Sequence, residues 1–268
     1  MAKGSKKKKK NSVGFWILIL ICLGVMAFAG YKLISLWLEY RQAQEEYDDL
    51  RTYTSEAEPP EGSAEEEEEA EAEEGLKAPI DVDWDALKKI NKDVVGWLYI
   101  GALDISYPIA HGTDNEFYLH HTIEGTYNFA GSIFEDFANS PKFTDPNTIL
   151  YGHNMKDRSM FGNLKFLTED NKVQQDPYFW VLTPEHNYRY RIFNVCVTAV
   201  DSDIYTLYSK ADKKFVKQAE KWQTYSSAGL EAQSFSKDSR IVTLSTCTSS
   251  ESQRYVVQGV RTEESTEG

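Results

Sequence analysis

One cysteine and one arginine near the C-terminus have the spacing of a reactive pair. The stretch IVTLSTCTSSESQRYVVQGV, residues 241–260, contains two apolar, β-branched runs separated by a polar loop. Cys247 ends the first run and Arg254 begins the second. If the two runs form antiparallel neighbours, the guanidinium lies beside the thiol, where it favours the thiolate and stabilises an oxyanion. On spacing alone, a buried cysteine and a surface arginine are the alternatives.

A nucleophilic cysteine also needs a proton partner, which is usually a histidine. The chain has five histidines. His186 lies in a predicted hairpin loop, and the others follow a helical turn (His120 and His121) or a strand (His111 and His153). His153, in TILYGHNMKD, ends an apolar strand and opens a loop rich in glycine and asparagine. Because strand ends on one rim of a barrel can meet, we expect His153 to be the partner.

The other two cysteines argue for free thiols rather than a disulfide. Cys22 lies in an apolar N-terminal run, so only Cys196 and Cys247 could pair. Cys196 alternates with Tyr190 and Ile192 along one face of a predicted strand. We therefore expect Cys196 to be a core thiol and Cys247 to be accessible.

The elements that must position these residues are mainly short strands. Strand-like runs bounded by turn residues are GWLYI, DISYPIA, GSIFED, NTILYGH, YFWVL, YRYRIFNVCVTAV and the two C-terminal runs. The TPEHN segment between two of them is typical of a hairpin loop. Many short strands with turns predict a mostly β domain, either a barrel or a sandwich.

Helices are predicted at four places in the same region. The segment DVDWDALKKIN has a capping Asp83 and apolar residues at helical spacing, NEFYLHH could form one turn, and SMFGNLKFL has helical periodicity. The strongest pattern covers residues 209–229, with Ser209 as the expected cap and Gly229 just beyond the end. Its shared apolar face consists of Phe215, Ala219 and Trp222.

The N-terminus predicts a membrane anchor. Residues 1–12 contain six lysines and no acid, and residues 13–31 contain no charge at all. About twenty such residues span a bilayer as a helix. Lysines before the span and acids after it place the N-terminus in the cytoplasm and the rest outside. A cleaved signal peptide with AFA at 27–29 is the alternative, but apolar residues continue past Lys32 to Leu38.

Charge is distributed unevenly along the 268 residues, whose formal net charge is −13. Residues 39–78 carry sixteen acids and three basic residues. Apart from two prolines, residues 56–75 contain no apolar side chain larger than alanine, so they cannot bury enough surface to offset their ordering entropy. We expect a solvated linker there, with a tether through a charged cell envelope as the functional alternative. The acidic balance argues against a nucleic-acid partner.

These observations divide the chain into five parts. We expect a basic cytoplasmic stub, a transmembrane signal-anchor helix, an acidic disordered spacer, a catalytic domain and a short tail, at residues 1–12, 13–38, 39–78, 79–263 and 264–268 respectively.

The ordered set of motifs resembles the sortases, membrane-anchored cysteine transpeptidases of Gram-positive bacteria. TLSTC followed by an arginine on the next strand, with LYGHNM upstream, resembles the family in general. NKDVVGWLYI, DISYPI, DNEFYLHH, GSIFEDF, NTILYGHNMKDRSMFGNL and the long helix before IVTLSTC are similar to class B. The resemblance covers roughly residues 80–260. It implies an eight-stranded β-barrel with an N-terminal helix and a long helix before the catalytic-cysteine strand.

The resemblance also implies a catalytic set and a substrate groove. Cys247 would be the nucleophile, His153 the general acid and base, and Arg254 the clamp for oxyanion and substrate. Residues expected to contact the sorting signal are Asn115, Leu119, Ser245, Ile204, Tyr205 and, through its backbone N–H, Thr248. Ordinary packing or a surface loop is the alternative for each of these contacts.

The implied reaction joins surface proteins to the cell wall. Class B enzymes commonly cleave NPxT-type sorting signals after threonine and transfer the protein to an amine of the peptidoglycan precursor lipid II. We expect no cofactor and no metal site, and we expect Asp201 and Asp203 to be solvated rather than calcium ligands. Two alternatives are a pilin polymerase of the same fold, with a lysine acceptor, and a membrane-anchored binding module with an idle cysteine.

Overall fold

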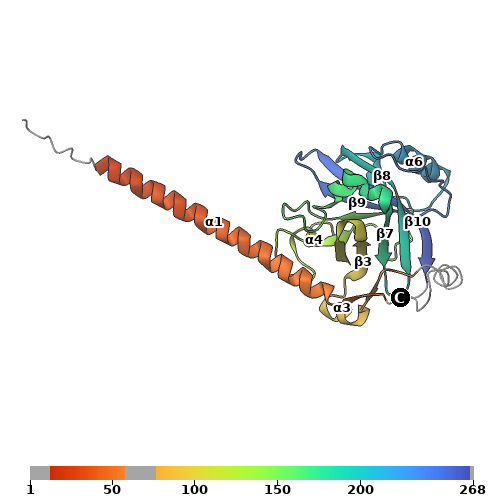
Figure 1. The fold of residues 1–268 in the computed structure, drawn as a ribbon, viewed down its shortest axis with the longest axis horizontal. Coiled ribbons are helices and arrows are strands. Elements are labelled where there is room, and N and C mark those ends of the chain that lie inside the picture. Colours follow the sequence, from red (N-terminus) through yellow and green to blue (C-terminus); the bar gives the residue numbers. More distant parts are fainter. Residues whose placement is uncertain (1–12, 58–76, 266–268) are drawn as a thin grey trace, which may run out of the picture. The chain divides into compact units, whose positions relative to one another are not determined.

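Eight strands close into a barrel in the computed structural model, which describes residues 13–57 and 77–265 (Figure 1). The strands follow the order β10-β8-β7-β3-β4-β5-β6-β9 around the barrel. Their bounds are β3 Val94–Ile100, β4 Ile105–His111, β5 Ile133–Glu135, β6 Asn147–Tyr151, β7 Tyr178–Leu182, β8 Asn187–Ala199, β9 Ile241–Cys247 and β10 Gln253–Ser265. The predicted eight-stranded barrel is confirmed.

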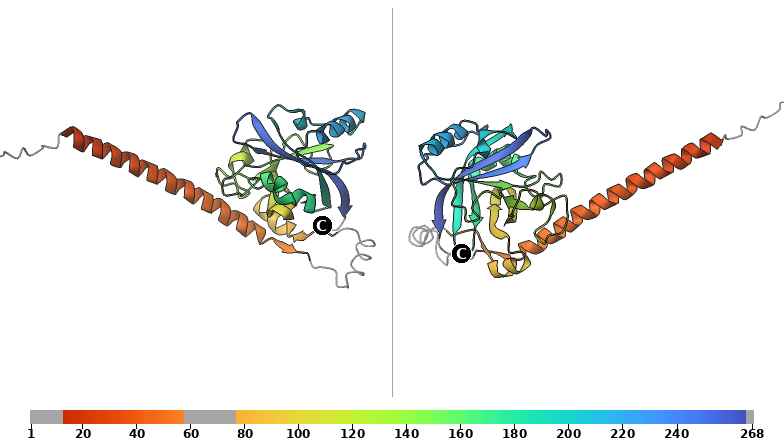
Figure 2. Two further views of the ribbon diagram at one scale, coloured as in Figure 1. Left: turned by 45° about the horizontal axis from the view of Figure 1, so that its top comes forward. Right: turned by 180° about the vertical axis from the view of Figure 1, so that it is seen from behind.

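Two of the strand pairs in this barrel are parallel. Most neighbouring strands are antiparallel, but β4 pairs with β5 and β6 pairs with β9 in parallel. On the other side of β9, β10 is antiparallel. The strand that ends on Cys247 therefore lies between the strand that leads to His153 and the strand that begins near Arg254 (Figure 2).

The barrel interior is apolar with a polar ladder through it. The first six residues of β9 are buried and only Cys247, its last residue, is exposed. Inside, Asn194 Nδ2 donates to Gln258 Oε1, and Gln258 Nε2 donates to Thr243 Oγ1. Thr243 Oγ1 in turn donates to Asn147 Oδ1. These three hydrogen bonds link buried polar side chains of four strands.

The helices form where the sequence predicts them, with three differences, the first of which is that the helix expected to end just before Gly229 ends at Gln223. Asp83 caps α3, Trp84–Ile90, through the backbone N–H of Ala86. The cap of α6, Lys213–Gln223, is Asp212 rather than the expected Ser209, because the Asp212 carboxylate accepts from the first-turn N–H groups. The predicted helical pattern in SMFGNLKFL begins later, as η2 Leu164–Asn171 followed by α5 Lys172–Gln175. Shorter helical pieces are η1 Gly101–Leu103, α4 Phe117–His120 and η3 Asp203–Tyr205.

Helix α6 covers one flank of the barrel beside β8 (Figure 1). Its predicted apolar face, Phe215, Ala219 and Trp222, is completely buried. These three side chains share a cluster with Cys196 of β8 and Ile204 of η3. Burial raises the pKa of the Cys196 thiol to about 11, which agrees with its expected role as a core thiol.

The apolar N-terminal run belongs to α1, Val13–Arg51. This helix is long and apolar enough to cross a membrane, a property that signal sequences share. The chain divides into two units between Gln42 and Ala43, so the last turns of α1 belong to the barrel unit. Residues 1–12, the part of the predicted spacer at 58–76 and residues 266–268 lie outside the described residues.

The start of the expected spacer is instead part of the folded domain. In residues 43–51 the side chains of Ala43, Tyr47 and Leu50 are buried. After the helix, β1 Thr54–Glu56 pairs antiparallel with β2 Ile80–Val82, and the Ala57 N–H donates to the Pro79 carbonyl at 3.1 Å. The two ends of the segment between Ala57 and Pro79 are therefore held together. For residues 43–57, the expectation of a disordered spacer is wrong.

Candidate functional site

The register of β6 and β9 brings His153 to the end of the barrel where Cys247 lies. Tyr151 is the partner of Ser245 in this parallel pair, and the Gly152 N–H donates to the Ser245 carbonyl. His153, just beyond the end of β6, and Cys247, the last residue of β9, each lie two residues further along the chain. A further hydrogen bond links the two chain segments, because Asn154 Nδ2 donates to the Cys247 carbonyl at 2.7 Å.

One cavity of about 280 Å³ lies at this end of the barrel. Six of the nine residues expected to be catalytic or substrate-binding line it, namely Asn115, Leu119, His153, Ser245, Cys247 and Arg254. The remaining lining residues are Phe134, Tyr151, Gly152 and Thr246. The cavity therefore combines a thiol, an imidazole and a guanidinium with apolar and amide side chains, as a peptide groove requires.

Arg254 stands opposite Cys247 in the antiparallel register of β10 and β9. Its Nη1 donates to the carbonyls of Glu251 and Gln253, both at 2.9 Å, which fixes the guanidinium at the start of β10. A guanidinium presents further N–H donors in a rigid fork. Arg254 can thus offer donors to negative charge beside an exposed thiol.

His153 is held by the backbone of α4. Its Nε2 lies 2.8 Å from the Leu119 carbonyl, and because a carbonyl only accepts, Nε2 carries the proton. Burial lowers the pKa of His153, the Leu119 carbonyl opposes this shift, and His120 nearby lowers it further. The ring of His120 lies 6.5 Å from that of His153, centroid to centroid.

Asp136 orients two residues of the cavity, although the sequence did not single it out. Tyr151 Oη and Asn115 Nδ2 both donate to Asp136 Oδ2 at 2.9 Å. The Asn115 Oδ1 accepts from the Phe137 N–H at 3.0 Å. A carboxylate directly after a short strand, two positions beyond the cavity-lining Phe134, is the signal that could have pointed to Asp136.

The other three expected contacts lie outside this lining. Tyr205 Oη is 2.8 Å from Ser245 Oγ, so it supports the cavity wall from behind. The Ile204 side chain is fully buried in the apolar cluster under α6, and its carbonyl accepts a hydrogen bond from Asn147 Nδ2. Thr248 follows the end of β9, and its hydroxyl donates to the carbonyls of Ser250 and Gln253.

Asp203 is not a simple solvated acid as expected. Its carboxylate accepts from Gln218 Nε2 and Lys221 Nζ at 2.8 and 2.6 Å. Trp222 Nε1 and Tyr225 Oη also donate to it. These bonds fix η3, which carries Tyr205, to helix α6 and to the turn after it.

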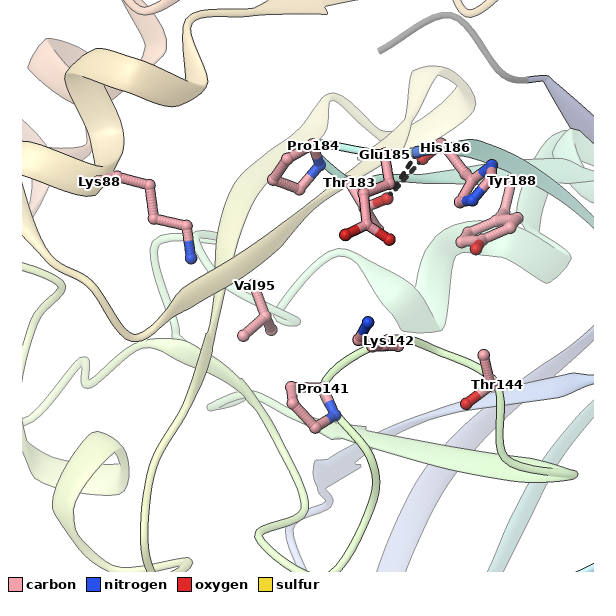
Figure 3. A pocket seen from close by; sticks show the side chains of 10 residues that line it. All are labelled: Lys88, Val95, Pro141, Lys142, Thr144, Thr183, Pro184, Glu185, His186 and Tyr188. Carbon is pink, nitrogen blue, oxygen red and sulfur yellow. Dashed lines mark hydrogen bonds between the residues drawn. The ribbon is translucent and has the colours of Figure 1, made fainter.

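A second hollow of about 290 Å³ lies at the other end of β6 (Figure 3). The loops that precede β6 and β8 line it, with Pro141, Lys142, Thr144 and residues 183–186, together with Lys88, Val95 and Tyr188. None of the nine expected site residues belongs to this lining. The thiol cavity is therefore the candidate active site.

Comparison with known proteins identifies the class of this barrel and its cavity. Residues 98–262 match the family model described as the sortase domain. The chain belongs to the sortase family, and it is a cysteine transpeptidase.

The relatives narrow this class to sortase B. The chain is 35% identical to sortase B of Listeria monocytogenes over 90% of its own length and 94% of the relative's length. Among solved structures, sortase B of Bacillus anthracis in complex with AAEK1 gives a TM-score of 0.68 at 26% identity, covering 85% of this chain and 100% of that one. The Staphylococcus aureus sortase B–substrate complex gives 0.68 at 25%, covering 84% and 99%. The expected resemblance to class B is confirmed.

Proposed function

We propose that this sortase B-type transpeptidase cleaves an NPxT-like sorting signal after threonine and transfers the protein to an amine of the cell wall. The observation that carries the proposal is the shared cavity of Cys247, His153 and Arg254 at the ends of three adjacent strands. A nucleophile, a proton donor and a fixed cation are the parts that acyl transfer through a thioester needs.

In the first half-reaction, the Cys247 thiolate attacks the carbonyl carbon of the threonine. The carbonyl oxygen becomes an oxyanion, which Arg254 and the Thr248 backbone N–H stabilise. His153 enters as imidazolium and gives its proton to the leaving amine. The C–N bond breaks, and a thioester remains on Cys247 while His153 becomes neutral.

In the second half-reaction, an amino group from a peptidoglycan precursor such as lipid II attacks the thioester. His153 accepts a proton from the attacking amine, and Arg254 again faces the oxyanion. The C–S bond breaks, an amide forms, and the thiolate and imidazolium are restored. No cofactor is needed to balance these steps.

Asn115, Leu119 and Ser245 contact the bound signal in this proposal, because they line the cavity beside the thiol. Tyr205 acts by holding Ser245 in place. Ile204 contributes to the groove only by packing beneath it, since its side chain is fully buried.

Mass spectrometry of the full chain tests this proposal. An NPQTN-type peptide should give a thioester adduct on the wild type, and an added amine should convert it to a threonine amide. Cys247→Ala should give no adduct. Cys196→Ala is the matched control, and it should react normally because Cys196 is buried away from the cavity. An adduct that persists in Cys247→Ala would overturn the assignment, and an exclusive reaction with LPxTG-type peptides would replace the NPxT-like signal.

The proposal places the N-terminus in the cytoplasm and the barrel outside, with α1 as an uncleaved anchor. Its support is the run of lysines before the apolar segment and the acids after it. On intact cells that produce the chain, a membrane-impermeant maleimide should label the wild type, and Cys247→Ala should lose that label. Labelling only after the cells are lysed would reverse the orientation.

A further inference from the structure

We propose that Tyr47, on the last turns of α1, is a positioning residue for His153. The inference rests on the proposed role of His153 as general acid and base. It assigns to the helix that carries the apolar segment a second task, which is to hold the catalytic imidazole in one orientation.

Tyr47 is anchored inside the barrel unit. Its side chain is 5% exposed, and its hydroxyl donates to the Gly131 carbonyl at 2.6 Å. The same hydroxyl lies 3.2 Å from Ser132 Oγ. Glu46 adds a neighbouring contact, because its carboxylate accepts from the Glu124 N–H at 3.0 Å. Two consecutive residues of α1 therefore bond to the segment between α4 and β5. Glu46 bonds to it near its start and Tyr47 bonds to it at its end.

That segment is bonded to the end of α4, which carries the carbonyl that orients the catalytic imidazole. The Ser132 N–H donates to the Tyr118 carbonyl at 2.8 Å, and Ser132 Oγ donates to the His121 carbonyl at 2.9 Å. These bonds fix the backbone on both sides of Leu119. The Leu119 carbonyl is the partner of His153 Nε2.

Gly131 makes the connection especially close. Its φ is +55°, a left-handed conformation that glycine adopts without strain. A Cβ atom at this position would lie 2.5 Å from the Leu119 carbonyl oxygen. The peptide that accepts the hydrogen bond from Tyr47 is thus packed directly against the carbonyl that holds His153.

A second path from Tyr47 reaches the backbone of His153. The Tyr47 ring meets the ring of Tyr107 edge to face, with 5.4 Å between centroids. Tyr107 Oη accepts from the Met160 N–H at 3.2 Å, and the Phe161 N–H donates to the His153 carbonyl at 3.0 Å. One side chain on α1 therefore supports both the ring and the main chain of His153.

The chemical effect is to fix which ring nitrogen exchanges protons. With Nε2–H held by the Leu119 carbonyl, Nδ1 is the nitrogen that accepts or releases the catalytic proton. If the Leu119 peptide moves, the ring can rotate or change tautomer. Proton transfer in the cavity then becomes slower, while the peptide groove around Asn115 and Ser245 keeps its shape.

Tyr47→Phe in the full chain in detergent is the primary test. It removes the hydroxyl and keeps the ring. We expect kcat to fall on the order of three- to tenfold, the effect of losing one hydrogen bond, with the KM for the sorting peptide nearly unchanged. In ¹⁵N-histidine spectra, the His153 ring should change from a single Nε2–H tautomer to a mixture. Tyr53→Phe, on the partly exposed tyrosine after α1, is the matched control and should show neither effect.

The possible outcomes separate this inference from the proposed function. If Tyr47→Phe leaves both kcat and the His153 spectrum unchanged, or lowers kcat without changing that spectrum, the positioning role is wrong. If His153→Ala keeps transpeptidase activity, the proposed acid–base role fails instead. Should Tyr47→Phe not fold, Ser132→Ala removes the next hydroxyl in the relay. It must then produce the same loss of kcat and the same tautomer mixture, and their absence would overturn the inference.

Discussion

Arg254 and Cys247 face each other as register partners on adjacent antiparallel strands. The sheet register, rather than a flexible loop, thus sets the position of the guanidinium relative to the thiol. Two backbone carbonyls fix Arg254 Nη1 in addition. The cation is in place before any negative charge develops, and such preorganisation gives electrostatic catalysis its strength.

Replacing Arg254 by lysine should therefore lower activity strongly, although the positive charge is kept. Lysine keeps the charge but loses the rigid fork of donors that both the backbone carbonyls and an oxyanion require. We expect kcat to fall by roughly 10²–10³-fold, the usual cost of losing an oxyanion donor. Arg240→Lys, at the opposite end of β9, should have little effect in the same peptide assay. Equal activities of the two variants would contradict the oxyanion role of Arg254.

The pH dependence of kcat/KM should depend on His120. Burial and His120 both lower the pKa of His153, so less imidazolium is present at neutral pH. Replacing His120 by glutamine removes one of these two causes and should raise the pKa of His153. The limb of the profile that His153 governs should then move to higher pH. His121→Gln is the control, and a limb that stays fixed in both variants would show that His153 does not govern it.

Asp136→Asn should weaken peptide binding more than it slows chemistry. The carboxylate holds Tyr151 and Asn115, which line the cavity, whereas an amide cannot accept from both with the same charge-assisted strength. We expect KM to rise on the order of three- to tenfold with a smaller change in kcat. Asp157→Asn, an exposed carboxylate, is the control. An unchanged KM would mean that the two side chains keep their positions without Asp136.

Stability should fall as the pH rises through a window set by Glu135. Burial raises the pKa of Glu135 to about 7, and the hydrogen bond to Glu135 raises the pKa of His111. Both groups hold protons more tightly when folded, so their contribution is greatest below the unfolded pKa of about 4.5 for the carboxyl. It is lost as the pH rises through about 7.

Glu135→Gln should make the folding stability depend less on pH. Between about pH 5 and 8, thermal unfolding of the wild type should shift by an amount equivalent to no more than a few kcal/mol, and the variant should shift less. Glu116→Gln replaces an exposed carboxylate and should keep the wild-type slope. A slope that is unaffected by Glu135→Gln would assign the pH dependence to other groups.

Much of the fold could be predicted because the signals were local. Alternating apolar runs identified the strands, and the spacing of Phe215, Ala219 and Trp222 identified the buried face of α6. The cap of this helix was misplaced because Ser209 and Asp212 are both good capping residues. Only the backbone conformation decides between them, and it starts the helix at Lys213.

The remaining features depend on contacts between distant residues. Asn115 and Asp136 are 21 positions apart, and neither has an unusual local pattern. β1 is a three-residue strand with the sequence TSE, whose strand character comes from its partner β2. Tyr47 lies in a charged stretch that reads as solvated, because only the folded barrel offers it Gly131 and Ser132.

Because β1 pairs with β2, the helix α1 is joined to the barrel in two ways, by the covalent chain and by non-covalent contacts. The polypeptide continues from Ala57 to Lys77 through the acidic segment, whereas Tyr47, Arg51 and Thr54 bond directly to other residues of the barrel unit. A single cut within residues 58–76 would break the covalent path but leave these contacts in place. We therefore expect the barrel to stay attached to its helix after such a nick. The result would be a two-chain enzyme held together by the β1–β2 sheet and the last turns of α1.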